Sequence, residues 1–412
     1  MAAILVVVCA SCGELLPNCP TPDGGTIDAS SEGAPAADGG LDAVADSPLD
    51  ASANDSGNEG SASACPPRVH SGSTAVTYQI DVAHTGSQPL DTIALPLCKR
   101  WSATLMGKAT YPLIANGAVY VTGVGPTGAA TLYAFDIDTG TKLWGPVVAG
   151  TTSVGLAYDN GKIFTLVEGP AAVGYDAANG QTLWVTALEQ INRGPSVGAT
   201  AVGGTDYFSD GSGSAFALDE TTGAVLWQQY TVGQGGSPAI VGGTCFESAG
   251  EETAYAFDVT DGGAVWQDIV GIDGSGFTSP VYQGRFYEWN KPSGVVVDSA
   301  DGGSIGTFST ETTPAFGGSS VLYVNGGVVS AVDIASGAPL WTYGTSVSIA
   351  PITVGGQVVV ATSAGEVVVL DGSGNVLSSD NTGAAIAGSD SIGMAAADGV
   401  LAVPVGDTLV VY

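Results

Sequence analysis

The chain has 412 residues and a formal net charge of -31 at pH 7, because 40 Asp and Glu residues face only nine Lys and Arg. So few cations cannot form the basic stripe that nucleic acid requires, and they also disfavour direct binding to an anionic membrane surface. The 62 glycines and the low share of charged residues, 12%, indicate many tight turns and short strands.

The first segment, residues 1–12, has the composition of an export signal. Its apolar run AAILVVVCA is much shorter than the roughly 20 residues that a membrane-spanning helix needs. Small residues directly before Cys12 resemble a bacterial lipoprotein signal, in which the cysteine is lipidated. Cys9 at the third position before Cys12, and the lack of a preceding Lys or Arg, depart from that pattern. An ordinary cleaved signal is the alternative.

Residues 13–67 consist mainly of Ala, Gly, Asp, Ser and Pro, with acids that no base opposes. Such a composition cannot bury a core, so we expect a disordered acidic linker. Together with lipidation of Cys12, it predicts an exported protein tethered to the bacterial cell envelope by a lipid, at the outer membrane on its periplasmic or surface side. Residues 68–97 then form a lead-in segment, in which strand-like alternation begins at Thr74.

From residue 98 to 412 a phrase of the form A-x-D-x-x-T-G-x-x-x-W recurs. Its aspartates follow one another at intervals of 35 to 43 residues, and they are Asp136, Asp176, Asp219, Asp258, Asp298, Asp333 and Asp371. The tryptophans in the repeat position are Trp101, Trp144, Trp184, Trp227, Trp266 and Trp341. This period is typical of four-stranded propeller blades, so the repeat predicts an all-β protein.

The two ends of the repeat region complete each other. Trp101 stands 43 residues before Trp144 without the usual phrase before it, while the last residues up to Tyr412 supply only three strands. We therefore predict an eight-bladed β-propeller whose last blade joins three C-terminal strands to one N-terminal strand. Seven blades is the alternative, if the degenerate copies at Gly306 and Ser378 are not separate blades.

The repeated residues are expected to be structural. Asp and Thr oxygens in the D-x-x-T-G turn can accept hydrogen bonds from backbone N–H groups, and Gly permits a positive φ. The large face of each Trp can cover the junction with the neighbouring blade.

With this phrase, the chain from Trp101 to Tyr412 resembles the PQQ-like, or quinoprotein-type, propeller family. The resemblance implies an eight-bladed ring. The family contains PQQ-dependent alcohol and glucose dehydrogenases, and also non-catalytic lipoproteins such as the barrel-assembly propeller of Gram-negative outer membranes. Fold alone does not choose between these functions.

The residues that such a dehydrogenase would need are not recognisable. It requires Ca²⁺ held by Glu, Asn and Asp, and a carboxylate base, and we can assign none of these. The adjacent-cysteine pair and a C-x-x-C-H haem motif are missing from the sequence. His70 and His84 are the only histidines and both precede the ring, which disfavours a zinc site or a Ser-His-Asp triad. We expect no catalytic residue, metal or cofactor; PQQ with Ca²⁺ belongs to the alternative.

The cysteines suggest one crosslink. Cys65 could pair with Cys98 and pin the end of the linker to the ring, or Cys19 could pair with Cys65 instead. Cys245 lies in mid-strand and is expected to pack as a small apolar residue.

One face of the ring should be irregular, because it carries the loops between second and third strands and between blades. Arg193, Trp289 and Lys291 fall there, and an exposed Trp beside cations is a candidate contact for a partner protein or a glycan. The alternative is that Trp289 packs in the core or against a loop. We expect a monomeric, non-catalytic scaffold that binds an envelope protein. The alternatives are a PQQ-dependent oxidoreductase and a carbohydrate-binding surface lipoprotein.

Overall fold

The computed structural model describes residues 65–151, 155–167, 171–188, 198–210, 213–233, 235–272, 277–388 and 392–412. The signal, Cys12, Cys19 and almost all of the linker lie outside these residues. The regular structure of the described chain is entirely β, in strands β1 to β34. Across these residues, no helix is long and apolar enough to cross a membrane.

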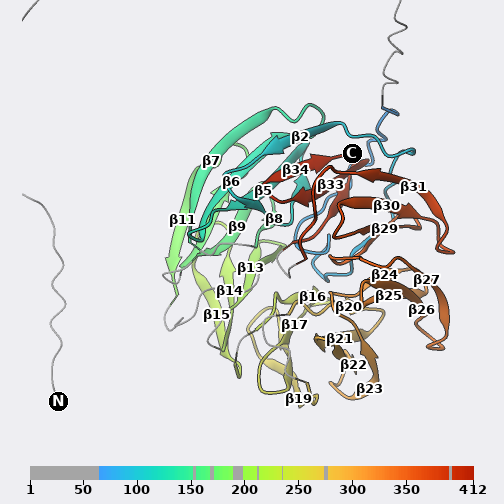
Figure 1. Cartoon of the computed structure of the whole chain (residues 1–412). Helices are drawn as coiled ribbons and strands as arrows, with labels where there is room; N and C mark the ends of the chain where they lie inside the picture. Colours follow the sequence, from blue (N-terminus) through green and yellow to red (C-terminus); the bar gives the residue numbers. More distant parts are fainter. Residues whose placement is uncertain are drawn as a thin grey trace, which may run out of the picture. The chain divides into compact units, whose positions relative to one another are not determined.

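The strands form eight sheets arranged in a ring (Figure 1). We number the blades in chain order. Blade 1 contains β4 (Leu113–Ala115), β5 (Ala118–Val124), β6 (Ala129–Asp136) and β7 (Lys142–Thr151). Blade 2 contains β8 (Ala157–Asp159), β9 (Lys162–Val167), β10 (Ala171–Asp176) and β11 (Thr182–Ala187). Blade 3 contains β12 (Thr200–Val202), β13 (Thr205–Ser209), β14 (Ser214–Asp219) and β15 (Val225–Tyr230). Blade 4 contains β16 (Ala239–Val241), β17 (Thr244–Ser248), β18 (Thr253–Asp258) and β19 (Ala264–Ile269).

Blade 5 contains β20 (Val281–Tyr282), β21 (Arg285–Asn290), β22 (Ser293–Asp298) and β23 (Ser304–Ser309). Blade 6 contains β24 (Ala315–Gly317), β25 (Ser320–Asn325), β26 (Val328–Asp333) and β27 (Pro339–Tyr343). Blade 7 contains β28 (Ile352–Val354), β29 (Gln357–Ala361), β30 (Glu366–Leu370) and β31 (Val376–Asn381). Blade 8 contains β32 (Ala395–Ala397), β33 (Val400–Val405), β34 (Thr408–Val411) and β2 (Trp101–Thr104). Two short strands extend these sheets: β3 (Lys108–Ala109) pairs with β5, and β1 (Ser87–Gln88) with β28.

The ring closes as the sequence predicts. β2 pairs antiparallel with β34, with Trp101 opposite Val411, so an N-terminal strand completes the three C-terminal ones. The degenerate copies at Gly306 and Ser378 belong to full outer strands, β23 and β31. The prediction of eight four-stranded blades is confirmed, and the seven-bladed alternative is wrong.

The repeat tryptophans join six of the eight blades to the blade that follows. Each indole Nε1 donates a hydrogen bond of 2.9 to 3.0 Å to the carbonyl of the residue that follows the repeat aspartate of the next blade. The acceptors, in order from Trp101 to Trp341, are Ile137, Ala177, Glu220, Val259, Ser299 and Gly372. The indole ring also packs closely on the turn glycine of the next blade. A Cβ at Gly180, for example, would lie 2.6 Å from Trp144.

The repeat aspartates cap their turns. Asp136 Oδ1 accepts hydrogen bonds from Thr139 N at 2.8 Å and from the Thr139 hydroxyl at 2.8 Å. These hydrogen bonds lower the pKa of Asp136, because they favour the ionised carboxylate. The other six repeat aspartates likewise accept a backbone N–H from two to four residues further on.

The centre of the ring is filled by the chain itself. Residues 74–91, which we call the axial segment, pass the innermost strands of all eight blades in chain order. Backbone hydrogen bonds or side-chain contacts join them to Ile114, Tyr158, Ala199, Ile240, Val281, Phe316, Thr353 and Ala396. The blue trace of this segment lies among the inner strands in Figure 1.

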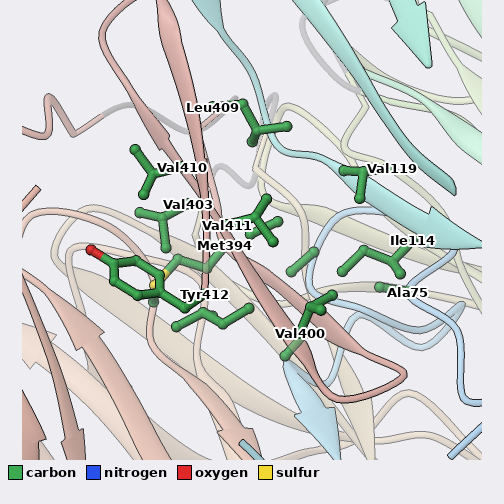
Figure 2. Packing of buried hydrophobic residues seen from close by; sticks show 14 of the residues in the cluster. Ala75, Ile114, Val119, Met394, Val400, Val403, Leu409, Val410, Val411 and Tyr412 are labelled. Atoms are coloured by element: carbon green, nitrogen blue, oxygen red, sulfur yellow. The ribbon is translucent and has the colours of Figure 1, made fainter. Parts of the chain in front are cut away.

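Backbone chemistry explains this course. The innermost strand of a blade has one edge without a sheet partner, and a buried N–H without an acceptor costs free energy. The carbonyls of Val82, Ala83, Thr85 and Gly86 accept the inward N–H groups of four successive blades at 2.7 to 3.0 Å. Figure 2 shows Ala75 of the axial segment beside Ile114 of β4, in the apolar cluster that also contains β33 and β34.

His84 is the central polar residue of the axial segment, with no exposed surface. Its Nδ1 lies 2.8 Å from the Tyr78 carbonyl and its Nε2 lies 3.0 Å from the Pro238 carbonyl. Burial lowers the pKa of His84, since the charged ring is poorly solvated there. From this position His84 orders the axial segment against blade 4.

Cys65 and Cys98 form a disulfide with a Cα–Cα distance of 5.4 Å, one of the two pairings that the sequence leaves open. It ties the start of the described chain to the residue three before β2. Cys245 is a buried free cysteine on β17.

We predict that His84→Ala lowers the free energy of unfolding by about 2–4 kcal/mol, because it opens a cavity and removes the one ring N–H that donates to a buried carbonyl. Denaturant unfolding of the purified protein measures the change. The matched control is His70→Ala, since the His70 side chain is 65% exposed; it should change stability by less than about 0.5 kcal/mol. Equal effects of the two variants would contradict a central role for the axial segment.

Candidate binding face

Two hollows lie on the irregular face, which we call the connector face. The loops between second and third strands and the connections between blades meet there, whereas the opposite face, the turn face, carries the D-x-x-T-G turns. The hollows have volumes of about 390 and 610 Å³ and share Gly388 in their walls. Loops held on a rigid ring are common positions for binding residues.

The smaller hollow contains one cation and one acid. Lys291 and Pro292 come from the loop between β21 and β22, and Glu311 comes from the connection between blades 5 and 6. The Glu311 carboxylate accepts a hydrogen bond from Gly326 N at 3.0 Å, which fixes it on the surface. Tyr78 of the axial segment lines the inner wall. The hollow therefore presents both charges at the edge of the filled axis.

The larger hollow is more apolar and lies at the seam between blades 8 and 1. Its walls include Lys108 of β3, Val124, Pro126 and Ile392, with Asp407 as its acid. Of the described residues that line the two hollows, Lys108 and Lys291 are the cations. Sequence reasoning missed Lys108 and Glu311, although a lysine in a chain with so few cations is a usable signal.

Trp289 is not the exposed contact residue that the sequence suggested. Only 1% of its surface is exposed, and its indole Nε1 donates a hydrogen bond of 2.9 Å to the Thr278 carbonyl. Its ring centroid lies 4.6 Å from that of Phe277, and Lys291 Nζ lies 5.4 Å from the same Phe277 ring. Both faces of β21 are covered, since its four central residues are all buried. Trp289 is one of them, so it supports Lys291 from beneath instead of contacting a partner.

The third candidate, Arg193, lies outside the described residues. The structure thus brings Trp289 and Lys291 together through Phe277, and of the pair only Lys291 is at the surface.

Glu247 is a buried acid near the connector face, on β17. Burial raises the pKa of Glu247 to about 8, and the neighbouring Asp210 adds to the rise, while the Ser209 and Thr231 hydroxyls oppose it. A carboxyl with such a pKa can serve as a general base, but Glu247 lines neither hollow. Within the described ranges, no group of three or more His, Cys, Asp or Glu residues is arranged to hold a metal ion.

The Trp repeat, the eight blades and the closure through β2 define the class of protein as a PQQ-like β-propeller. Residues 99–193, 171–284 and 291–411 match the family described as outer membrane protein assembly factor BamB. Because these matches extend over more than half of the chain, the protein belongs to this family.

Solved structures agree with the fold. BamB from Moraxella catarrhalis aligns with a TM-score of 0.60 and 20% identity, over 77% of this chain and 99% of that one. The quinohemoprotein alcohol dehydrogenase from Comamonas testosteroni aligns with a TM-score of 0.66 and 14% identity, over 82% and 80% of the two chains. The computationally designed Ika8 protein aligns with a TM-score of 0.63 and 15% identity, over 75% and 97%. No curated protein sequence matches the chain.

We predict that Glu247→Gln removes one pH-dependent component of stability. The ordinary pKa of a glutamate is 4.5, and in the folded protein that of Glu247 is about 8. The folded state therefore holds the proton more tightly, so stability falls as pH rises from about 4.5 to 8. Each pH unit in this window costs up to ~1.4 kcal/mol.

The measurement is the free energy of unfolding at pH 5 and at pH 8 for both proteins. The neutral amide needs no proton, so the variant should gain stability relative to the parent at pH 8. Parallel profiles for the two proteins would show that Glu247 is ionised at no cost.

Proposed function

We propose that this protein is a non-catalytic scaffold, held in the bacterial envelope by a lipid on Cys12, that binds a protein partner through the connector face. The single observation that carries the proposal is the axial segment, which occupies the centre of the ring and bonds to the inner strands of all eight blades. With the axis filled, the open features of the connector face are hollows with walls of mixed charge, which suit the side chains of a protein.

Membership of the BamB-described family supports this proposal. The similar structure from Moraxella is also named BamB. At 20% identity, its likeness to this chain concerns the fold alone. The acidic linker suits a tether, because a chain of this composition can span a variable distance between a lipid and a folded ring.

The lining residues of the two hollows argue against PQQ with Ca²⁺ at the connector face. The quinone carries three carboxylates, which need several cations, whereas each hollow offers one lysine, together with an acid among its lining residues. The glycan reading depended on an exposed Trp289, and this residue is buried.

We expect a photo-crosslinking amino acid at Glu311 or Pro126 to capture a discrete envelope protein in cells that make the full chain. Both residues are exposed and line the hollows. Ala178 and Ala300, exposed residues of the turn face, are the matched control positions. Mass spectrometry of the adducts identifies the partner. Capture only from the control positions, or from all four equally, would contradict binding through the connector face.

A calorimetric titration of the purified protein with PQQ, with and without Ca²⁺, tests the absence of a cofactor site. We expect no saturable heat. Binding with a dissociation constant of about 1 μM or tighter would replace the scaffold proposal with the oxidoreductase one.

A further inference from the structure

Two of the eight blade junctions lack the repeat tryptophan, and the first of them lies between blades 5 and 6. In blade 5 the repeat position holds Gly306, which lies opposite Val296 just as Trp266 lies opposite Ala256 in blade 4. A Cβ built at Gly306 would have no atom within 4 Å. Neither would one built at Gly337, the turn glycine of blade 6 that such a tryptophan would cover.

The hydrogen bond of the missing indole is made by another group. Ile334 is the residue after the repeat aspartate of blade 6, and its carbonyl accepts a bond of 2.6 Å from Arg285 Nη1. Arg285 lies on β21 of blade 5, the blade that would have supplied the tryptophan. The guanidinium thus replaces the N–H donor but does not replace the ring.

The space that the missing indole would fill remains as a cavity of about 440 Å³ between blades 5 and 6. Its walls include Tyr287, Phe308 and Tyr323, together with Arg285 and Gly306. The rings of Phe308 and Tyr323 are stacked with their centroids 5.0 Å apart, so one wall is a preformed aromatic surface. We call this cavity the aromatic slot.

The other junction without a tryptophan is closed differently. In blade 7 the repeat position holds Ser378, whose hydroxyl accepts a hydrogen bond of 2.9 Å from Leu97 N. Leu97 is itself buried and covers this junction. Loss of the tryptophan is therefore compensated by the chain at Ser378 but not at Gly306.

We propose that the aromatic slot is a binding site for a planar aromatic ring of indole size. At six other junctions of this propeller, an indole lies between the outer strand of one blade and the turn of the next. The shape of the slot is therefore one that an indole fits. The Ile334 carbonyl has a second lone pair for an N–H donor, and the Arg285 guanidinium can lie against the π-face of a ring.

This site is separate from the proposed scaffold function. The slot includes residues of the outer strand β23 and of the turn face, and none of its lining residues belongs to either hollow. Failure of one proposal leaves the other unaffected.

The experiment titrates the full-length protein with 5-fluoroindole, followed by ¹⁹F NMR and calorimetry, and in a parallel arm with N-acetyl-tryptophanamide. We expect one site with a dissociation constant of about 10⁻⁴ M for the ring alone. Binding of the amide as well would show that a ring carried on a polypeptide can enter, whereas exclusion of the amide would restrict the slot to small molecules.

Two variants localise the site. Gly306→Trp restores the repeat residue, so it should fold with equal or higher thermal stability and bind 5-fluoroindole at least about tenfold more weakly. Trp341→Gly should open an equivalent slot at the next junction and raise the stoichiometry from one to two. No saturable binding by the folded parent protein, or undiminished binding by a folded Gly306→Trp variant, would overturn the proposal.

Discussion

The constraint on which the structure depends is the unpaired backbone at the centre of the ring. Eight inner strands each turn one edge toward the axis, and their N–H groups need acceptors because water cannot reach them there. Backbone carbonyls of the axial segment supply such acceptors to blades 1, 2 and 4 to 7, from Ala75 for blade 1 to Gly86 for blade 7. At blade 3 the Thr77 hydroxyl instead donates a hydrogen bond to the Ala199 carbonyl. The residues that order the centre thus come from the part of the chain that precedes the repeats.

The rim of the ring obeys a second rule, which the tryptophans impose. Each indole bonds to a carbonyl and covers a glycine of the next blade, so one residue type fixes both the distance and the angle between neighbours. A ring joined in this way tolerates the loss of a link, because the remaining blades still hold the geometry. Blade 5 shows the result: Gly306 leaves the sheets in place and leaves space between them.

The sequence is sufficient for the blades because the signal is periodic and local. A phrase such as ALDETTGAVLW contains the turn cap, the glycine and the docking indole in eleven consecutive residues. The axial course of residues 74–91 was not predictable, since its contacts lie far away in sequence and involve backbone groups that every residue possesses. Trp289 was misjudged because its burial depends on neighbours that cover both faces of β21, and a position near a loop does not reveal that cover.

The positions of the cations bear on the kind of partner that suits the connector face. Arg68 is paired with Asp138 and Asp398, and Arg285 with the Ile334 carbonyl, so these scarce charges are committed to holding the fold. Lys108 and Lys291 border the hollows, in a molecule whose net charge is -31. An acidic ring repels acidic partners in general, and a lysine within each hollow allows an acidic side chain to be accepted locally. Specificity of this face would then arise from the position of two cations, with long-range attraction favouring a partner whose surface is otherwise basic.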